Sequence, residues 1–401
     1  MVDAIPARRA FLIVMDSVGI GGAPDAERFF NGTLPDSGAN TLGHIAREMP
    51  LHLPNLDALG LGAALTLASG MVVAGLGAAP QGLWGAASEV SPGKDTPSGH
   101  WELAGVPVPW NWHHFPDTIP SFPDELSRGI AALAGTAGIL GNCHASGTEI
   151  LAALGAEHLR TGWPICYTSA DSVLQIAAHE DSFGLERLYA LCRAVAQKVH
   201  PMRVGRVIAR PFSGREGDFR RTANRRDFAI PAPGETILDR AFAAGRATHA
   251  IGKIGDIFSH RGISHLHKGD SDAALSGHLL RLADTAEAGS LTFANFVEFD
   301  SLYGHRRDIA GYGRALEWFD RVAGAFLARM RPGDLAIFTA DHGNDPSWSG
   351  TDHTRERVPV LGWGYGAMPV GQVAFVDVAA SIADHLGLAP QGPGRSFLKA
   401  A

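Results

Sequence analysis

The chain has 401 residues, 45% of them hydrophobic and 19% charged, which supplies a large core and excludes a disordered protein. Its 34 lysines and arginines stand against 41 aspartates and glutamates, and the net charge of −7 argues against a general nucleic-acid-binding protein. The three cysteines are too few and too scattered for a disulfide framework or a zinc ribbon, so we expect buried thiols and a cytoplasmic location. The length favours two or three domains.

Two early segments have some features of export or membrane signals. Arg8 and Arg9 precede an apolar run, but Asp16 ends that run before it reaches the length of a signal-peptide core. Residues 58–88 carry no charge and are long enough to span a bilayer. Seven glycines and Pro80 interrupt this stretch, so we expect short strands and turns packed into a core, and no membrane association.

Apolar runs that stop abruptly at acidic or turn residues predict the strands of a parallel sheet. They cover residues 11–15, 291–299, 335–340 and 358–364. Strands covered on both faces need near-continuous apolar sequence, as these runs have. Helical spacing predicts a helix over 311–330, and residues 373–387 predict a further strand and helix. This alternation indicates an α/β fold.

The middle of the chain has a different composition. It contains proline and tryptophan clusters, and eight arginines lie between Arg203 and Arg226. Such a run is by itself typical of a solvated face or a linker. We expect residues 108–232 to form an inserted second domain, and residues 1–107 and 233–401 to form the two parts of a core domain.

The predicted strand ends carry three aspartates, Asp16, Asp300 and Asp341. One aspartate after a strand means little, because aspartate starts turns readily. In open α/β sheets, however, ligands bind just beyond the carboxyl ends of the strands. We therefore expect these three carboxylates to contribute to one site.

Three histidines accompany the aspartates. His342 follows Asp341 directly, His305 lies five residues after Asp300, and His353 lies eleven residues after His342. Any one of these histidines alone would be interpreted as structural. Together, carboxylate oxygens and imidazole nitrogens suit two divalent ions such as Mn²⁺ or Zn²⁺. Two such ions can clamp the attacking and leaving oxygens of a phosphoryl transfer.

Residues 91–105 are a candidate source of a nucleophile. Thr96 lies there in a turn rich in glycine, proline and serine, just ahead of a predicted helix. Spacing alone favours a cap or turn residue. The alternative is a nucleophile whose hydroxyl is activated by a divalent cation and whose phosphate is favoured by the helix N-terminus.

Long motifs along nearly the whole chain resemble the phosphopentomutase family of the alkaline phosphatase superfamily. They include VMDSVGIGGAPDA, GKDTPSGHWE, FVEFDSLYGHRRD and TADHGNDPSWSGTDHTRE, in the order that the family has. The resemblance implies an alkaline-phosphatase-like α/β core, with a mainly parallel sheet flanked by helices, and a smaller inserted α/β cap domain.

The resemblance also implies roles for individual residues. Thr96 would be the residue that becomes phosphorylated, beside two Mn²⁺ ions. The six candidate ligands would divide into two groups: Asp16, Asp341 and His342 for the ion that touches Thr96, and Asp300, His305 and His353 for the other. Four further residues would hold the sugar phosphate: Asp171, Arg210, Arg225 and Lys253.

The activity implied is interconversion of α-D-ribose 1-phosphate and D-ribose 5-phosphate, and of the 2-deoxy forms, through a 1,5-bisphosphate. A sugar bisphosphate such as glucose 1,6-bisphosphate would prime the enzyme. The partners expected are small-molecule pentose phosphates, with no nucleic acid, membrane or obligate protein partner. The alternatives are a metal-dependent phosphomonoesterase or a cofactor-independent phosphoglycerate mutase-like enzyme, since the superfamily shares its metal ligands. A nucleotide-binding protein is disfavoured because no complete GxGxxG or Walker A motif occurs.

Overall fold

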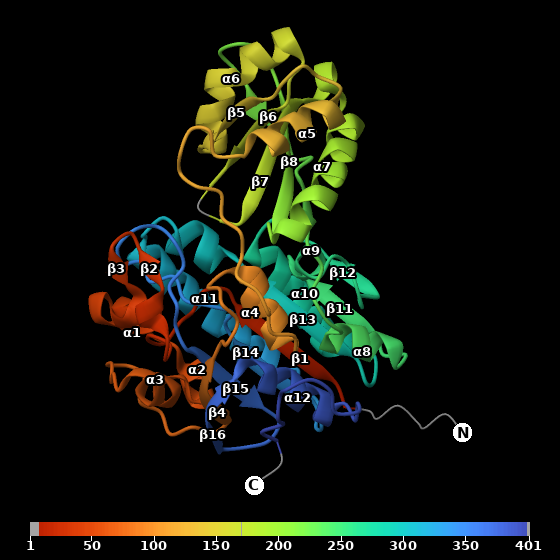
Figure 1. Cartoon of the computed structure of the whole chain (residues 1–401). Coiled ribbons are helices and arrows are strands. Elements are labelled where there is room, and N and C mark those ends of the chain that lie inside the picture. The colour runs from red at the N-terminus through yellow and green to blue at the C-terminus, as the bar shows by residue number, and fades with distance from the viewer. Residues whose placement is uncertain (1–7, 170, 399–401) are drawn as a thin grey trace. The chain divides into compact units, whose positions relative to one another are not determined.

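The computed structural model describes residues 8–169 and 171–398, which divide into two compact units (Figure 1). One unit comprises Met1–Pro109 and Ala232–Ala401, and the other is Trp110–Pro231. Parts of the expected domains, namely residues 1–7, 170 and 399–401, lie outside the described residues. Trp110–Pro231 is thus a separate unit inserted in the sequence of the first; its role as a cap stays a prediction.

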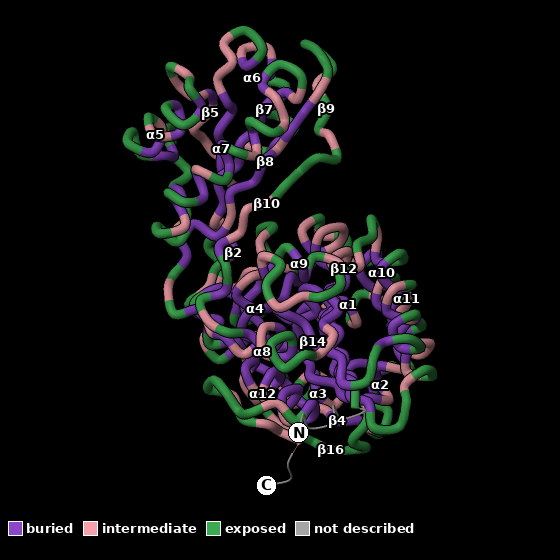
Figure 2. The backbone as a smooth tube through the Cα atoms, turned by 90° about the vertical axis from the view of Figure 1, so that its right-hand side faces the viewer, coloured by how far each residue is buried: buried purple, intermediate pink, exposed green. Residues whose placement is uncertain are grey.

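The first unit is built on an eight-stranded sheet in which all strands but one run in the same direction. In spatial order the strands are β12 (His265–His267), β11 (Thr248–Ile251), β13 (Leu291–Phe296), β1 (Ala10–Met15), β14 (Leu335–Thr339), β15 (Val358–Trp363), β4 (Leu83–Ser88) and β16 (Met368–Ala374). Strands β13, β1 and β14 are buried along their whole length, as strands covered on both faces must be. Figure 2 shows the buried tube around β14. The predicted α/β fold with a mainly parallel sheet is confirmed.

Helices flank this sheet in two groups. One group packs around α11 and contains α1 (Thr41–Glu48), α2 (Pro54–Leu59), α3 (Leu61–Ser69), α10 (Asp272–Thr285) and α11 (Ile309–Leu327). The other packs around α4 and α12 and contains α4 (Thr96–Leu103), α8 (Ile237–Ala243), α9 (Ile254–Ile257) and α12 (Phe375–His385). Short elements complete the unit: β2 (Phe30–Asn31), β3 (Leu34–Pro35), the 3-10 turns Ala26–Arg28 and Asp36–Gly38, and the π-helical turn Phe299–Gly304.

Strand β15 is the exception in the sheet, and the expectation that it runs parallel is wrong. It pairs antiparallel with both β14 and β4. Neighbouring antiparallel strands can be joined directly at one edge, whereas parallel neighbours need a crossover. The loop 340–357, which joins β14 to β15, therefore leaves and re-enters the sheet at the edge where β1, β13 and β4 end.

The uncharged stretch 58–88 contains helix α3 as well as strand β4. The expectation of short strands and turns therefore holds for β4 and for the irregular residues 70–82, but not for α3. Pro54 occupies the first turn of α2, and Gly60, at a φ of 114°, ends that helix and starts α3. Leu61 and Leu65 of α3 are fully buried, so this helix presents an apolar face to the core. Within the part of the chain that the structure describes, no helix is both long and apolar enough to cross a membrane.

The second unit is a smaller α/β structure with a mixed sheet. The sheet has the order β10 (Arg226–Ala229), β8 (Arg206–Ser213), β7 (Val173–His179), β6 (Ile165–Thr168) and β5 (Leu140–His144), and β9 (Arg220–Arg221) pairs with β8. Its helices are α5 (Asp124–Ala134), α6 (Gly147–Thr161) and α7 (Leu185–Val199), with a π-helical turn at Glu180–Gly184 and a 3-10 turn at His200–Met202. The expected α/β character of the inserted region is thereby confirmed.

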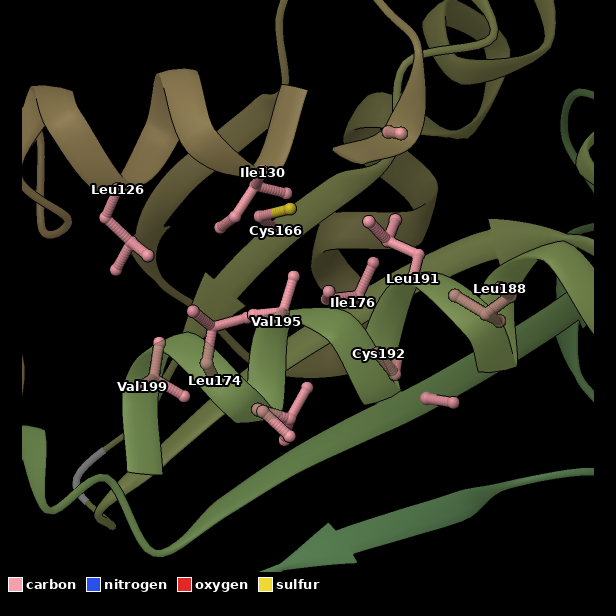
Figure 3. Close-up of a cluster of buried hydrophobic side chains, with 14 of the residues drawn as sticks. Leu126, Ile130, Cys166, Leu174, Ile176, Leu188, Leu191, Cys192, Val195 and Val199 are labelled. Atoms are coloured by element: carbon pink, nitrogen blue, oxygen red, sulfur yellow. The ribbon is translucent and has the colours of Figure 1, made fainter. Parts of the chain in front are cut away.

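Helices α5 and α7 cover one face of this sheet and bury two of the three cysteines (Figure 3). Cys166 and Cys192 lie among leucine, isoleucine and valine side chains such as Leu174 and Val195. Burial raises the pKa of both thiols, so they pack as small apolar groups. Cys143 is only partly buried, so the expectation of buried thiols holds for two of the three.

Candidate active site

The three predicted aspartates lie at one edge of the large sheet. Asp16 directly follows β1, Asp341 follows β14, and Asp300 lies in the π-helical turn after β13. Because β13, β1 and β14 are adjacent and parallel, their carboxyl ends meet at that edge. Ser17, with a φ of 69°, turns the chain after Asp16 and donates its backbone N–H to Oδ1 of Asp341 at 3.1 Å. The sheet itself thus brings these carboxylates together.

The first group of ligand atoms is formed by Asp16, Asp341 and His342. One ligand atom from each residue lies within 4.8 Å of the others, and all three residues are buried. Nε2 of His342 is 3.5 Å from Oδ1 of Asp16 and 3.3 Å from Oδ2 of Asp341. The hydroxyl oxygen of Thr96 lies 3.3 Å from the same nitrogen. The sequence-predicted nucleophile therefore lies beside this group.

The second group is formed by Asp300, His305 and His353, again with one ligand atom of each within 4.8 Å of the others. Nε2 of His305 is 3.2 Å from Oδ2 of Asp300, and Nε2 of His353 is 3.4 Å from Oδ1. The rings of His353 and His342 stack with centroids 4.0 Å apart, so the two groups are neighbours. All six predicted ligands are thus placed in two adjacent groups, in the division that the resemblance implies.

Thr96 is the first residue of α4, and the interpretation of it as a cap residue is wrong. The cap is Asp95, whose side chain accepts the backbone N–H of Ser98 at 3.1 Å. A β-carbon at Gly99 would overlap the carbonyl oxygen of Asp341, so only glycine allows α4 to approach the sheet edge this closely. The helix therefore presents Thr96 to the ligand groups from its N-terminal turn.

The donor and acceptor pattern of the first group fits a divalent cation. Nδ1 of His342 lies 3.1 Å from the carbonyl oxygen of Gly343 and must donate there, which leaves a lone pair on Nε2. Burial lowers the pKa of His342 to about 4, so the ring is neutral at pH 7. Oδ1 of Asp16 is buried and accepts no hydrogen bond from the described residues. Several lone pairs thus converge where a cation would satisfy them.

The surroundings shift the pKa values of the carboxyl groups in the two ligand groups. Burial, together with the charges of Asp341 and Asp300, raises the pKa of Asp16 well above its usual range. Burial acts in the same direction on Asp300, but His353 and His305 outweigh it and hold the pKa of that carboxyl well below its usual range. Two neighbouring carboxyls are therefore shifted in opposite directions by their surroundings.

Arg307 supports the second group, and sequence analysis did not assign it a role. Its guanidinium donates to the carbonyl oxygens of Gly350 and Asp352 and to Oδ1 of Asn344, at 2.7, 3.1 and 2.5 Å. Asn344 in turn donates to Oδ1 of Asp300 at 2.7 Å. Arg307 thereby fixes the loop that carries His353 and, through Asn344, one of the carboxylates.

Arg355 fixes the segment that leads to Thr96. It is almost fully buried and donates to the carboxylate and backbone oxygens of Glu89 and to the carbonyl oxygen of Gly93. Two residues before the threonine, Lys94 lies 3.4 Å from the carboxylate of Asp352. Both cations belong to motifs quoted above, but their partners are distant in sequence and could not be paired without the fold.

The predicted sugar-phosphate residues are divided between the units. Asp171, Arg210 and Arg225 belong to the second unit, whereas Lys253 is an exposed residue of the first. Arg210 donates from Nε to Oε1 of Gln175 at 3.0 Å, and burial, together with the charge of Arg225, lowers its pKa to about 10. Arg225 donates twice to the carboxylate of Asp227, and Asp171 lies 3.6 Å from Arg206. Their joint role in binding stays a prediction.

Comparison with known proteins decides the family. Residues 8–390 match the family described as the metalloenzyme superfamily. A phosphopentomutase of Chelativorans sp. is 55% identical, covering 98% of this chain and 98% of its own. A phosphopentomutase of Agrobacterium fabrum is 54% identical, covering 97% of this chain and all of its own. This chain belongs to the phosphopentomutase family.

Phosphopentomutases are isomerases, so the chain is an enzyme of that class. Membership of the metalloenzyme superfamily, together with the two ligand groups, supports the binding of divalent metal. Among solved structures, a phosphoglycerate mutase of Leishmania mexicana is 14% identical with a TM-score of 0.39, and the match covers 98% of each chain.

Proposed function

We propose that this phosphopentomutase interconverts α-D-ribose 1-phosphate and D-ribose 5-phosphate, and their 2-deoxy analogues, through a phosphorylated Thr96 and a pentose 1,5-bisphosphate. The observation that carries the proposal is the Thr96 hydroxyl, 3.3 Å from Nε2 of His342 and beside two adjacent three-ligand groups. The names of the relatives supply the reaction class and favour a mutase over the phosphomonoesterase and phosphoglycerate mutase-like alternatives.

The two groups would each hold one Mn²⁺. Asp16, Asp341 and His342 would bind the ion next to Thr96, and Asp300, His305 and His353 would bind the second. When bound, two divalent cations activate the hydroxyl and neutralise charge on the transferred phosphoryl group. The oxygen and nitrogen donors suit Mn²⁺, and no cysteine takes part.

Thr96 would carry the phosphoryl group between two half-reactions. In the first, the bond from phosphorus to Oγ1 breaks while a bond to the free sugar hydroxyl forms, and the proton of that hydroxyl replaces the phosphoryl group on Oγ1. The bisphosphate then presents its other phosphate, and the reverse transfer restores phosphorylated Thr96. The N-terminal turn of α4 favours negative charge beside Thr96 throughout.

The inserted unit would act as a cap that grips the substrate and keeps water from phosphorylated Thr96. Arg210 and Arg225 supply guanidinium forks that bind phosphate bidentately, and Asp171 and Lys253 complete the predicted set. Water exclusion matters because hydrolysis of the phosphothreonine would turn the mutase into a phosphatase. We propose pentose phosphates as its only obligate partners, a cytoplasmic location, and a sugar bisphosphate such as glucose 1,6-bisphosphate as the activator.

The phosphoenzyme can be tested directly. The protein is incubated with Mn²⁺ and glucose 1,6-bisphosphate, digested, and analysed by mass spectrometry. We expect one phosphoryl group on the peptide that contains Thr96, and none in Thr96→Ala. Full mutase activity in Thr96→Ala, or a phosphoryl group on another residue, would contradict the proposal.

A further inference from the structure

Two buried side chains outside the predicted ligand set link Thr96 to the first ligand group. Asn295 on β13 donates from Nδ2 to Oδ2 of Asp16 at 2.8 Å, and the same nitrogen lies 3.0 Å from Nε2 of His100. Nδ1 of His100, on α4, lies 2.9 Å from the carbonyl oxygen of Thr96 and 3.0 Å from Oδ2 of Asp341. Both side chains are fully buried.

The hydrogen-bond partners fix the tautomer of the ring. The amide nitrogen of Asn295 carries two hydrogens and cannot accept, so Nε2 of His100 must be the acceptor. The ring hydrogen therefore sits on Nδ1, where it faces the oxygens of Thr96 and Asp341. A flipped amide would turn its oxygen towards the carboxylate of Asp16, so the orientation with Nδ2 facing both Asp16 and His100 is the one that suits these two contacts.

Packing leaves the imidazole no alternative position. Its ring stacks on Phe293 with centroids 5.8 Å apart and an interplanar angle of 17°. The close approach of Gly99 to the backbone of Asp341 holds the same turn of α4 against the sheet edge. The network therefore connects the ends of three strands and one helix.

We propose that His100 and Asn295 are positioning residues that hold Asp16, Asp341 and Thr96 in one fixed geometry. Carboxylates that ligate metal need outer partners to orient them, and loss of such partners costs about 10- to 100-fold in metal affinity or activity. Here the same pair also fixes the backbone of the nucleophile. The inference rests on the proposed function of Thr96, but its effect on metal affinity does not depend on the reaction.

The test compares conservative and apolar replacements. His100→Phe keeps the aromatic packing on Phe293 but removes both polar contacts, and Asn295→Leu removes the amide. His100→Asn retains a donor near the place of Nδ1, whereas His100→Gln can reach only the place of Nε2. Trp101→Phe is the matched control, because it removes a buried hydrogen bond to Ile257 from the same helix.

Two quantities are measured for each variant: Mn²⁺ affinity by calorimetric titration of the metal-free protein, and kcat and KM with ribose 1-phosphate. We expect His100→Phe and Asn295→Leu to weaken Mn²⁺ binding about 10- to 100-fold and to lower kcat with KM little changed. His100→Asn should recover more of both quantities than His100→Gln does, because it keeps the donor that faces Thr96 and Asp341. Trp101→Phe should match the wild type in both.

Wild-type Mn²⁺ affinity and kcat in His100→Phe would overturn the proposal, as would equal losses in Trp101→Phe. If His100→Phe fails to fold, the same two quantities are measured in His100→Asn and Asn295→Leu, and wild-type Mn²⁺ affinity and kcat in Asn295→Leu would overturn the proposal. Failure of the proposed function is distinguishable, since it would appear as a wild-type protein that acquires no phosphoryl group on Thr96 while the Mn²⁺ titrations still differ.

Discussion

Replacing Asp16 with asparagine should stabilise the metal-free protein and destabilise the metal-bound one. Asp16 is buried beside Asp341, and the charges of both Asp341 and Asp300 raise its pKa in the same direction as burial. A carboxyl whose pKa is raised by folding lowers stability as the pH rises above its unfolded pKa, and the full loss is reached once the pH exceeds the folded pKa. Asparagine has the same shape, keeps an oxygen that can accept from Asn295, and carries no charge.

The size of the effect follows from the geometry. Ligand atoms of Asp16 and Asp341 lie within 4.8 Å of each other, and two unit charges at that separation repel by about 3.5 kcal/mol at an effective dielectric constant of about 20. Partial protonation of Asp16 relieves some of this repulsion. We therefore expect Asp16→Asn to raise the free energy of unfolding of the metal-free protein by about 1 to 3 kcal/mol. With Mn²⁺ at about 1,000 times its Kd, metal binding raises the free energy of unfolding of the wild type by about 4 kcal/mol. The variant lacks this stabilisation.

Thermal unfolding at pH 7.5, once with a chelator and once with Mn²⁺, measures the change in stability caused by Asp16→Asn in the metal-free and in the metal-bound protein. The midpoint of Asp16→Asn should lie above the wild type in chelator and below it in Mn²⁺. Asp300→Asn is the control: His353 and His305 outweigh burial and hold the pKa of Asp300 low, so its charge stabilises the fold at this pH and the variant should be less stable in both conditions. An Asp16→Asn protein that is no more stable than the wild type in chelator would refute the electrostatic reasoning.

Three further predictions concern support and stability. Arg355→Met leaves Glu89 buried without its cationic partner, although burial already raises the pKa of this carboxyl well above its usual range. The free energy of unfolding from a denaturant titration should fall by about 3 to 5 kcal/mol, and an unchanged midpoint would contradict this. Burial raises the pKa of Glu356 to about 7, so the metal-free wild type should lose stability as the pH rises from about 4.5 to about 7, and Glu356→Gln should flatten that slope in thermal scans across this range. Leu174→Ala in the core of the second unit should lower the free energy of unfolding by about 2 to 5 kcal/mol. The Mn²⁺ affinity measured by calorimetry should stay at the wild-type value.

The sequence alone predicted those parts of the site that follow from strand ends. Asp16, Asp300 and Asp341 each terminate a near-continuous apolar run, and the carboxyl ends of neighbouring parallel strands must meet at one edge. His342 and His305 follow because they lie one and five residues after an aspartate, and His353 lies farther along the same loop as His342. The family resemblance then supplied the division into two groups and singled out Thr96.

The remaining features depend on contacts between distant segments. The antiparallel direction of β15 could not be predicted, because buried strands of either direction have similar apolar sequences. Helix α3 was mistaken for strands and turns because a glycine-rich uncharged stretch suits both. The contacts of His100 could not be inferred from the sequence, since its partner Asn295 lies on a strand 195 residues away.

The most direct test of the account follows ribose 1-phosphate with Mn²⁺ and a trace of glucose 1,6-bisphosphate, and assays ribose 5-phosphate and inorganic phosphate in the same samples. The account predicts ribose 5-phosphate without release of phosphate, because Thr96 returns every phosphoryl group to the sugar. Release of inorganic phosphate without isomerisation would contradict it.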